Sequence, residues 1–227
     1  TIELRKLGHE AYSNDLIECS GGHPEWHIQQ DTLQLINPLC KRFDLQSGGS
    51  YFSDYKWDMI IAFPPCTFLS NSGARWMYKS KIDAHLKPWE REPHPNYPYR
   101  RHQQALGAEF FMAIANADCQ NIAIENPMNV MGSIYRKKDQ VIQPYEFGDP
   151  HKKTTWLWLK GLTKLTPTNI VKPNLREYVS GTGKKTTFSV DYMENKRGKN
   201  GDSSSLRSKT YPGIAKAMAE QWAGKVI

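Results

Sequence analysis

The chain has 227 residues and a mass of 26.1 kDa, which suits one large domain or a main domain with a small appendage. With 39% hydrophobic and 23% charged residues it can build a core, so neither wholesale disorder nor a disulfide-stapled miniprotein fits. No apolar run approaches the roughly 18–20 residues of a membrane span, and no basic-then-apolar leader is seen. We therefore expect a soluble intracellular protein with no membrane partner.

Charge and cysteine content narrow the possible partners. Between Arg136 and Lys209 the chain holds 16 Lys/Arg against 7 Asp/Glu, although the whole chain carries only +7. A basic segment on a near-neutral body is typical of a protein that binds nucleic acid, and the alternative is a solvated surface without a partner. The four cysteines lie far apart and form no CxxC pair. We therefore predict neither a structural zinc site nor a disulfide framework, and no metal.

The first part of the chain predicts short elements. These are an amphipathic helix over 2–7, strands over 10–18 and 27–31, and a loop over 44–56. The two strands end in acidic residues, Asp15 and Glu18 in the first and Asp31 in the second. Such positions are typical of ligand-binding edges in open sheets.

The middle of the chain predicts a βαβ unit. The apolar run 57–63 indicates a buried strand that stops at Pro64-Pro65, and the proline-rich stretch 79–99 indicates a long loop or lid. A helix is expected over 100–117, followed by a second buried strand over 121–125. Strand, helix and strand in this order favour an open, mostly parallel sheet with flanking helices.

The last third predicts one more strand, a basic appendage and a final helix. The strand covers 154–162, and the helix begins near Pro212 and ends near Gly224. We expect 1–162 with 210–227 to form the main domain and 163–209 to form a small, partly mobile, basic segment.

Two reactive side chains are expected at the same edge of the predicted sheet. Cys66 directly follows two prolines, whose stiff backbone can hold the thiol in one direction as a nucleophile requires. Glu125 ends the next strand, where partial desolvation favours its protonated form, so that it can act as a proton donor. The alternatives are an inert thiol and a carboxylate held in an ion pair.

Several motifs in register resemble those of the cytosine-5 DNA methyltransferases, especially the compact phage and prophage proteins. DMIIAFPPCTFLS (58–70) is similar to the catalytic strand and loop of that family, and IAIENPMNV (122–130) to its Glu-Asn-Val motif. FGDPHKKTTWLWL (147–159) resembles its Gly-x-Pro-Gln-x-Arg-x-Arg motif. SNDLIE (13–18), QQD (29–31) and TYPGIAKAMAEQ (210–221) resemble segments that surround the cofactor.

The resemblance implies a class I methyltransferase-like fold and an S-adenosylmethionine-dependent enzyme that methylates carbon 5 of cytosine in DNA, with the base flipped into the site. It also implies a cytoplasmic location in a bacterial host or phage-infected cell, and homodimerisation would be one way to add sequence specificity. In the implied reaction Cys66 forms a covalent adduct with the ring, Glu125 is the acid, and Lys153 lies near the ring carbonyl. The residues implied to bind the cofactor are Asp15, Glu18, Asp31 and Pro64. Those expected to contact the nucleic acid are Ser70, Arg75, Asn126, His151, Lys152, Lys184 and Lys185.

The sequence also departs from this family pattern. Residues that differ from the family motifs are Thr67, Pro127, His151, Lys153 and Thr155. The family's glycine-rich cofactor loop is not found ahead of the first predicted helix, so we expect an incomplete cofactor site. Two alternatives therefore stay open: a catalytically silent DNA-binding protein on the same fold, and a related enzyme that attaches a different group to the pyrimidine. Phe63 and Cys66, on either side of the double proline, disfavour an amino-group methyltransferase.

Overall fold

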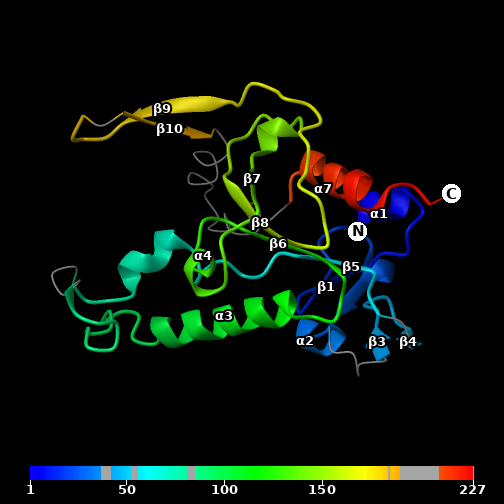
Figure 1. The fold of residues 1–227 in the computed structure, drawn as a ribbon, viewed down its shortest axis with the longest axis horizontal. Helices are drawn as coiled ribbons and strands as arrows, with labels where there is room; N and C mark the ends of the chain where they lie inside the picture. The colour runs from blue at the N-terminus through cyan, green and yellow to red at the C-terminus, as the bar shows by residue number, and fades with distance from the viewer. Residues whose placement is uncertain (37–41, 53–55, 81–84, 184, 190–209, 227) are drawn as a thin grey trace. The chain divides into compact units, whose positions relative to one another are not determined.

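The computed structural model describes residues 1–36, 42–52, 56–80, 85–183, 185–189 and 210–226, which form two compact units. The central unit consists of Asn14–Gln140 and Thr155–Leu162. The terminal unit consists of Thr1–Ser13, Val141–Thr154 and Thr163–Ile227. Figure 1 labels the elements of both units.

The largest sheet in the structure has four strands in the order β5-β6-β8-β7. Its strands are β5 (Met59–Ala62), β6 (Asn121–Asn126), β8 (Thr155–Lys160) and β7 (Gln140–Ile142). β5 and β6 are parallel, with Ala62 opposite Ile124. β6 and β8 are antiparallel, with Glu125 opposite Leu157.

The predicted open, mostly parallel sheet with flanking helices is wrong. Further sheets in the described ranges have only two strands each: β1 (Ser13–Asp15) with β2 (His27–Gln29), β3 (Arg42–Asp44) with β4 (Ser50–Phe52), and β9 (Leu175–Val179) with β10 (Lys185–Ser189). The β3–β4 and β9–β10 pairs are antiparallel.

The physical reason lies in the connections. Parallel neighbours need a long crossover, usually a helix, and α3 (Arg100–Ala115) supplies one between β5 and β6. The chain between β6 and β8 contains β7, the four-residue α4 (Met131–Ile134) and a 3-10 turn, Pro144–Glu146, but no long helix, and β8 runs back antiparallel. The predicted βαβ unit is present as β5-α3-β6, but the rest of the sheet does not continue its parallel order.

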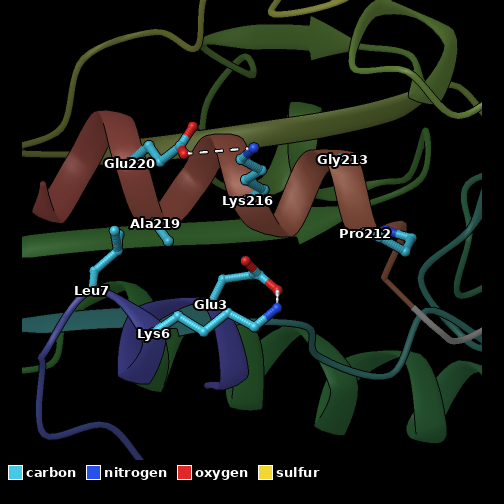
Figure 2. Close-up of a pocket in the computed structure, with 8 residues that line it drawn as sticks. All are labelled: Glu3, Lys6, Leu7, Pro212, Gly213, Lys216, Ala219 and Glu220. Atoms are coloured by element: carbon cyan, nitrogen blue, oxygen red, sulfur yellow. Dashed lines mark hydrogen bonds and ion pairs between the residues drawn. The ribbon is translucent and has the colours of Figure 1, made fainter. Parts of the chain in front are cut away.

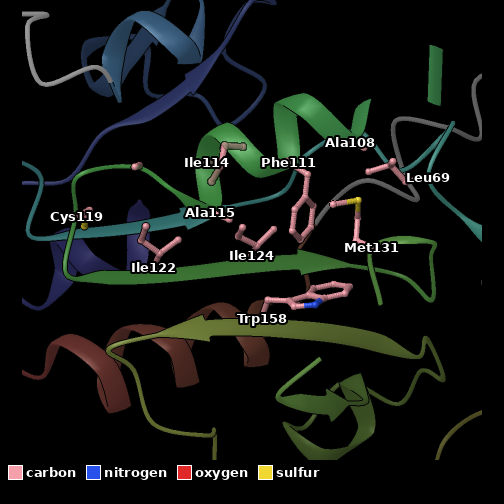
Figure 3. Packing of buried hydrophobic residues seen from close by; sticks show 11 residues of the cluster. Leu69, Ala108, Phe111, Ile114, Ala115, Cys119, Ile122, Ile124, Met131 and Trp158 are labelled. Atoms are coloured by element: carbon pink, nitrogen blue, oxygen red, sulfur yellow. The ribbon is translucent and has the colours of Figure 1, made fainter. Parts of the chain in front are cut away.

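The hydrophobic core of the central unit lies between α3 and the sheet (Figure 3). Phe111 and Ile114 of α3 are buried against a cluster that includes Ile124 of β6 and Trp158 of β8. The rings of Phe111 and Trp158 meet edge to face, with centroids 5.2 Å apart. Burying a side chain of this size contributes about 1.5–3 kcal/mol, so this contact fixes α3 across the sheet.

The remaining elements are short. In the central unit they are η1 (Pro24–Trp26), α2 (Thr32–Leu35) and η2 (Asn71–Trp76). The terminal unit contains α1 (Ile2–Lys6) and α7 (Pro212–Met218), which continues as the π-helical turn η5 (Ala219–Ala223). No helix in the ranges that the structure describes is long and apolar enough to cross a membrane.

Most of the predicted helices and strands are confirmed. The first helix is followed by Gly8 with φ +94°, a conformation that favours glycine, and the last helical turn is followed by Gly224 with φ +69°. The loop predicted over 44–56 is wrong, because β4 lies within it and forms a hairpin with β3. The β9–β10 hairpin was not predicted either, since its polar strands show little apolar periodicity.

Candidate functional site

Cys66 lies in a tight turn after β5, within what we call the cysteine loop, residues 63–71. The Cys66 carbonyl accepts backbone hydrogen bonds from Leu69 (3.1 Å) and Ser70 (2.8 Å). The side chain is half-buried, and its Sγ makes no hydrogen bond to any residue that the structure describes. The turn therefore fixes the backbone while leaving the thiol available.

Asn126 connects this loop to the end of β6. Its side chain is buried, and its Nδ2 donates to the carbonyl of Pro64 (2.7 Å). Its Oδ1 accepts from Nδ2 of Asn129 (2.8 Å), which is also buried, and Oδ1 of Asn129 accepts from the backbone N–H of Met131 (2.8 Å). Buried amides that use both ends in this way fix the loops they join.

Backbone hydrogen bonds join the same two segments directly. We call residues 126–130 the asparagine loop. Asn71 donates its N–H to the carbonyl of Met128 (3.2 Å), and Val130 donates to the carbonyl of Leu69 (3.1 Å). The PPC and ENP motifs, which lie about sixty residues apart in the sequence, thus form one hydrogen-bonded pair of loops.

Glu125 lies next to this pair of loops, on β6. Side chains alternate along a strand, and Ile124 faces the core under α3, so Glu125 points to the opposite face of the sheet. It is half-buried. Because β5 ends at Ala62 opposite Ile124, the chain that leads to Cys66 leaves the sheet beside Glu125. The structure therefore places Cys66 and Glu125 at the ends of neighbouring parallel strands.

Helix α3 holds the cysteine loop from its other side. Nη2 of Arg100 donates to the carbonyl of Thr67 (2.9 Å), and Nε2 of Gln104 donates to the carbonyl of Phe68 (3.1 Å). Arg100 is buried, with its guanidinium 5.3 Å from the Phe68 ring centroid. A side chain at position 73 would overlap this guanidinium, so Gly73 is required for the close approach.

Sequence reasoning missed Arg100, Gln104 and Asn129. The spacing of Arg100 and Gln104 by four residues places them on one face of the predicted helix, which is the signal that the sequence offered. Asn129 carried no comparable signal, because a polar residue in a loop is expected to face solvent.

Cys119 in the hydrophobic core and Cys66 in the cysteine loop have different surroundings. Cys119 is buried, donates its thiol to the carbonyl of Asn121 (3.2 Å), and has its pKa raised chiefly by burial. Cys66 is half-buried. Since the thiolate is the nucleophile, Cys119 suits packing, and Cys66 is the better candidate for chemistry.

Of the predicted cofactor residues, Asp15 is the last residue of β1, and Asp31 follows the end of the paired strand β2 by two residues. Nδ2 of Asn14 donates to the carbonyls of Ile28 (2.9 Å) and Gln30 (2.7 Å), which connects β1 to β2 and to the residue after it. Both aspartates are exposed. Asp31 caps α2 by accepting from the backbone of Leu33 (3.0 Å).

Asp15 and the two other predicted cofactor residues have different surroundings. One oxygen of Asp15 accepts from the backbone N–H of Leu16 (2.7 Å). Glu18 is exposed just after the bend at 16–17, whereas Pro64 is buried and bonded to Asn126 through its carbonyl.

Several predicted catalytic and nucleic-acid residues belong to the terminal unit, whereas Cys66 and Glu125 belong to the central unit. Lys153 and His151 both lie near Tyr211, with Nζ of Lys153 5.8 Å from its ring centroid and the His151 ring 5.4 Å away. Lys152 and Lys185 are exposed. Lys184 lies outside the described residues, as does the stretch 190–209 of the predicted basic segment.

The other predicted nucleic-acid residues lie on or next to the cysteine loop. Ser70 forms an isolated bridge with Asn129, and its hydroxyl is 3.0 Å from that of Ser72. Arg75 is exposed on η2, with its guanidinium 4.7 Å from the ring centroid of Trp76.

A cavity of about 480 Å³ lies between α1 and α7 in the terminal unit (Figure 2). Its charged lining residues form two pairs, Lys6 with Glu3 (2.7 Å) and Lys216 with Glu220 (3.8 Å). Because these charges balance, the cavity does not select for an anion. None of the residues predicted for catalysis or cofactor binding lines it.

Within the ranges that the structure describes, no group of three His, Cys, Asp or Glu side chains could hold a metal ion. Comparison of the chain with protein-family models, with curated proteins and with solved structures finds no significant match.

Proposed function

We propose that this chain is a DNA cytosine-5 methyltransferase in which Cys66 is the nucleophile and Glu125 is the proton donor. The observation that carries the proposal is the hydrogen-bonded pairing of the cysteine loop with the asparagine loop. The hydrogen bond from Nδ2 of Asn126 to the Pro64 carbonyl is 2.7 Å long. It joins the residue after Glu125 to the residue two positions before Cys66. Nucleophilic catalysis depends on holding the reacting groups within about an ångström of the productive geometry. Hydrogen bonds between two loops restrict the movement of the residues that they carry.

The chemistry assigns a separate task to each residue. The Cys66 thiolate adds to carbon 6 of the cytosine ring, and Glu125 donates a proton to the neighbouring ring nitrogen. Neutralising the ring in this way makes carbon 5 nucleophilic, and acid assistance of this kind contributes about 10²–10⁴-fold in rate. After carbon 5 has taken the methyl group, loss of its proton, departure of the thiolate and return of the ring-nitrogen proton to Glu125 restore the ring. The base has to leave a duplex, or be unpaired, to reach the thiol.

The cofactor side of the proposal rests on the β1 and β2 ends. Asp15 ends β1 and is followed by the exposed side chains of Leu16 and Ile17, and Asp31 follows the paired strand β2 by two residues. Carboxylates suit ribose hydroxyls, and exposed apolar side chains suit an adenine ring, so these residues fit the nucleoside part of S-adenosylmethionine. Bound there, S-adenosylmethionine would supply the methyl group.

Exchange of hydrogen at carbon 5 tests the nucleophile without any cofactor. When Cys66 adds to carbon 6, carbon 5 takes a proton from solvent, so reversal in D₂O leaves deuterium on the base. We expect deuterium in cytosine from DNA incubated with the wild-type chain, measured by mass spectrometry of its nucleosides. Cys66→Ser should abolish the exchange, and Glu125→Gln should slow it by about 10²–10⁴-fold.

Cys19→Ser is the matched control, because Cys19 is also a half-buried free thiol. It should leave the exchange unchanged. Full exchange by Cys66→Ser would refute the nucleophile assignment. Methyl transfer from labelled S-adenosylmethionine then identifies the transferred group, since a different carbon-5 modification gives a different nucleoside mass.

A second candidate is a DNA-binding protein without catalysis. It is favoured by the small, mostly antiparallel sheets, which replace the large parallel sheet expected to carry the cofactor. Tight DNA binding that weakens with salt, without any carbon-5 exchange, would support this candidate over the enzyme.

A further inference from the structure

We propose that residues 75–80 and 85–101, which we call the aromatic segment, bind single-stranded DNA, so that the substrate is an unpaired cytosine. The inference rests on the proposed function for the identity of the target base. The segment begins in η2 and ends in the first turn of α3. It contains five Trp or Tyr residues and six Lys or Arg against two acidic residues, a net charge of +4.

Rings of this segment are available for stacking. Trp76, His94 and Tyr97 form a cluster with centroids 5.3–5.6 Å apart. Trp89 and Tyr99 are outside that cluster and expose 69% and 73% of their surfaces. Exposed Trp and Tyr rings can stack on bases, and cations beside them can contact the phosphates.

Arg75 and Arg91 each lie over a ring of this segment, and Nη2 of Arg91 also donates to the carbonyl of Ser80 (3.1 Å). The guanidinium of Arg75 is 4.7 Å from the Trp76 centroid, and that of Arg91 is 3.7 Å from Tyr78. Neither forms an ion pair within the ranges that the structure describes. A nearby acid is already engaged, since Glu92 pairs with Lys79 at 2.6 Å. Cations placed over rings and free of carboxylates suit a strand whose phosphates follow its stacked bases.

The segment follows the cysteine loop in the chain through η2, and its other end is hydrogen-bonded to that loop. η2 begins at Asn71, whose N–H bonds to Met128 of the asparagine loop. At the other end Arg100 bonds to the carbonyl of Thr67, the residue after Cys66. The Arg100 bond places the end of the segment next to the residue that follows Cys66.

The same features select against a duplex. Base faces in a duplex are covered by their neighbours in the stack, so exposed rings gain nothing from them. In a single strand the faces are free, and each stacked base contributes independently of its identity. The aromatic segment therefore predicts weak sequence preference and a clear preference for unpaired DNA.

Fluorescence anisotropy with the full chain tests this inference. The probe is a labelled, cytosine-containing oligonucleotide of about 12 nucleotides, within the site sizes of single-strand grooves. It is compared with its duplex and with RNA of the same sequence. We expect the single-stranded DNA to bind tightest, and Trp89→Ala to weaken it about five-fold or more through loss of one stacked base.

Two further variants separate stacking from charge. Arg75→Gln should lower the slope of log affinity against log salt by about 0.7, as expected for one phosphate contact on a single strand. Tyr51→Ala is the matched control, because Tyr51 is an exposed ring outside the segment with 46% of its surface accessible. It should bind as the wild type does.

The outcomes distinguish this inference from the proposed function. Equal or tighter binding of the duplex or the RNA, or unchanged binding by Trp89→Ala, would overturn the inference even where carbon-5 exchange is observed. The wild-type chain is also compared with Cys66→Ala. If the wild-type chain shows no carbon-5 exchange and both chains prefer single-stranded DNA, the result supports the binding surface and refutes the catalytic proposal.

Discussion

Asn126→Ala is the substitution that most directly probes the pairing of the two loops. The side chain is 1% exposed and joins the Pro64 carbonyl to the amide of Asn129. Alanine leaves both of these partners buried without a hydrogen bond. Each unsatisfied buried group costs about 1–3 kcal/mol, so we expect a loss of about 2–5 kcal/mol in the free energy of unfolding. Small domains have about 5–15 kcal/mol in total, so the variant should fold but be markedly less stable.

Urea unfolding followed by tryptophan fluorescence measures this loss, because Trp158 lies in the core of the same unit. Asn96→Ala is the control, since Asn96 is exposed and should change stability by less than about 0.5 kcal/mol. The double variant Asn126→Ala/Asn129→Ala should be less destabilised than the sum of the two single variants, because one hydrogen bond is counted twice. An Asn126→Ala chain as stable as the control would refute the claim that this amide holds the loops together.

Further predictions concern packing, thiol reactivity and pH. Gly213→Ala should lower stability by about 1–3 kcal/mol in urea unfolding, because its Cβ would overlap the backbone carbonyl of Phe147 and the main chain would have to shift. Iodoacetamide at pH 8 should modify Cys66 faster than Cys119, since burial raises the pKa of the Cys119 thiol and leaves less thiolate, and peptide mass spectrometry after timed quenching measures both rates. Burial, followed by a hydrogen bond to a neighbouring carboxylate, raises the pKa of Tyr12 to about 12. Unfolded tyrosine ionises near pH 10, so this stabilisation is complete below about pH 10 and is lost as the pH rises toward 12, and Tyr12→Phe should flatten that part of a stability–pH profile.

Local pattern was sufficient to predict the elements that carry the site. The apolar run before Pro64 and the run before Glu125 are strands that end as expected, and the helix between them makes them parallel. These predictions succeeded because each depends on neighbouring residues and on one connection whose handedness and length are constrained.

The rest of the sheet depended on pairings that the local pattern does not specify. The direction of β8 follows from a connection without a long helix, and the β3–β4 hairpin forms in a polar stretch where Gly48 and Gly49 make the turn. In the site, the sequence indicated that Arg100 and Gln104 share a helix face but not which loop that face meets. Such contacts are set by packing, which short-range periodicity does not report.

The small sheets and the proposed chemistry are compatible, because the chemistry requires only two strand ends and not a large sheet. The thiol has to approach one atom from one direction, so its backbone has to be held from several sides. In this chain Asn126 holds Pro64 ahead of Cys66, whereas Arg100 and Gln104 hold the two residues after it. Asn126 belongs to β6, whereas Arg100 and Gln104 belong to α3. If either β6 or α3 tilts, the hydrogen bonds from the other element still hold the cysteine loop. The placement of Cys66 therefore depends on the β5-α3-β6 unit, the part of the predicted parallel fold that the structure contains.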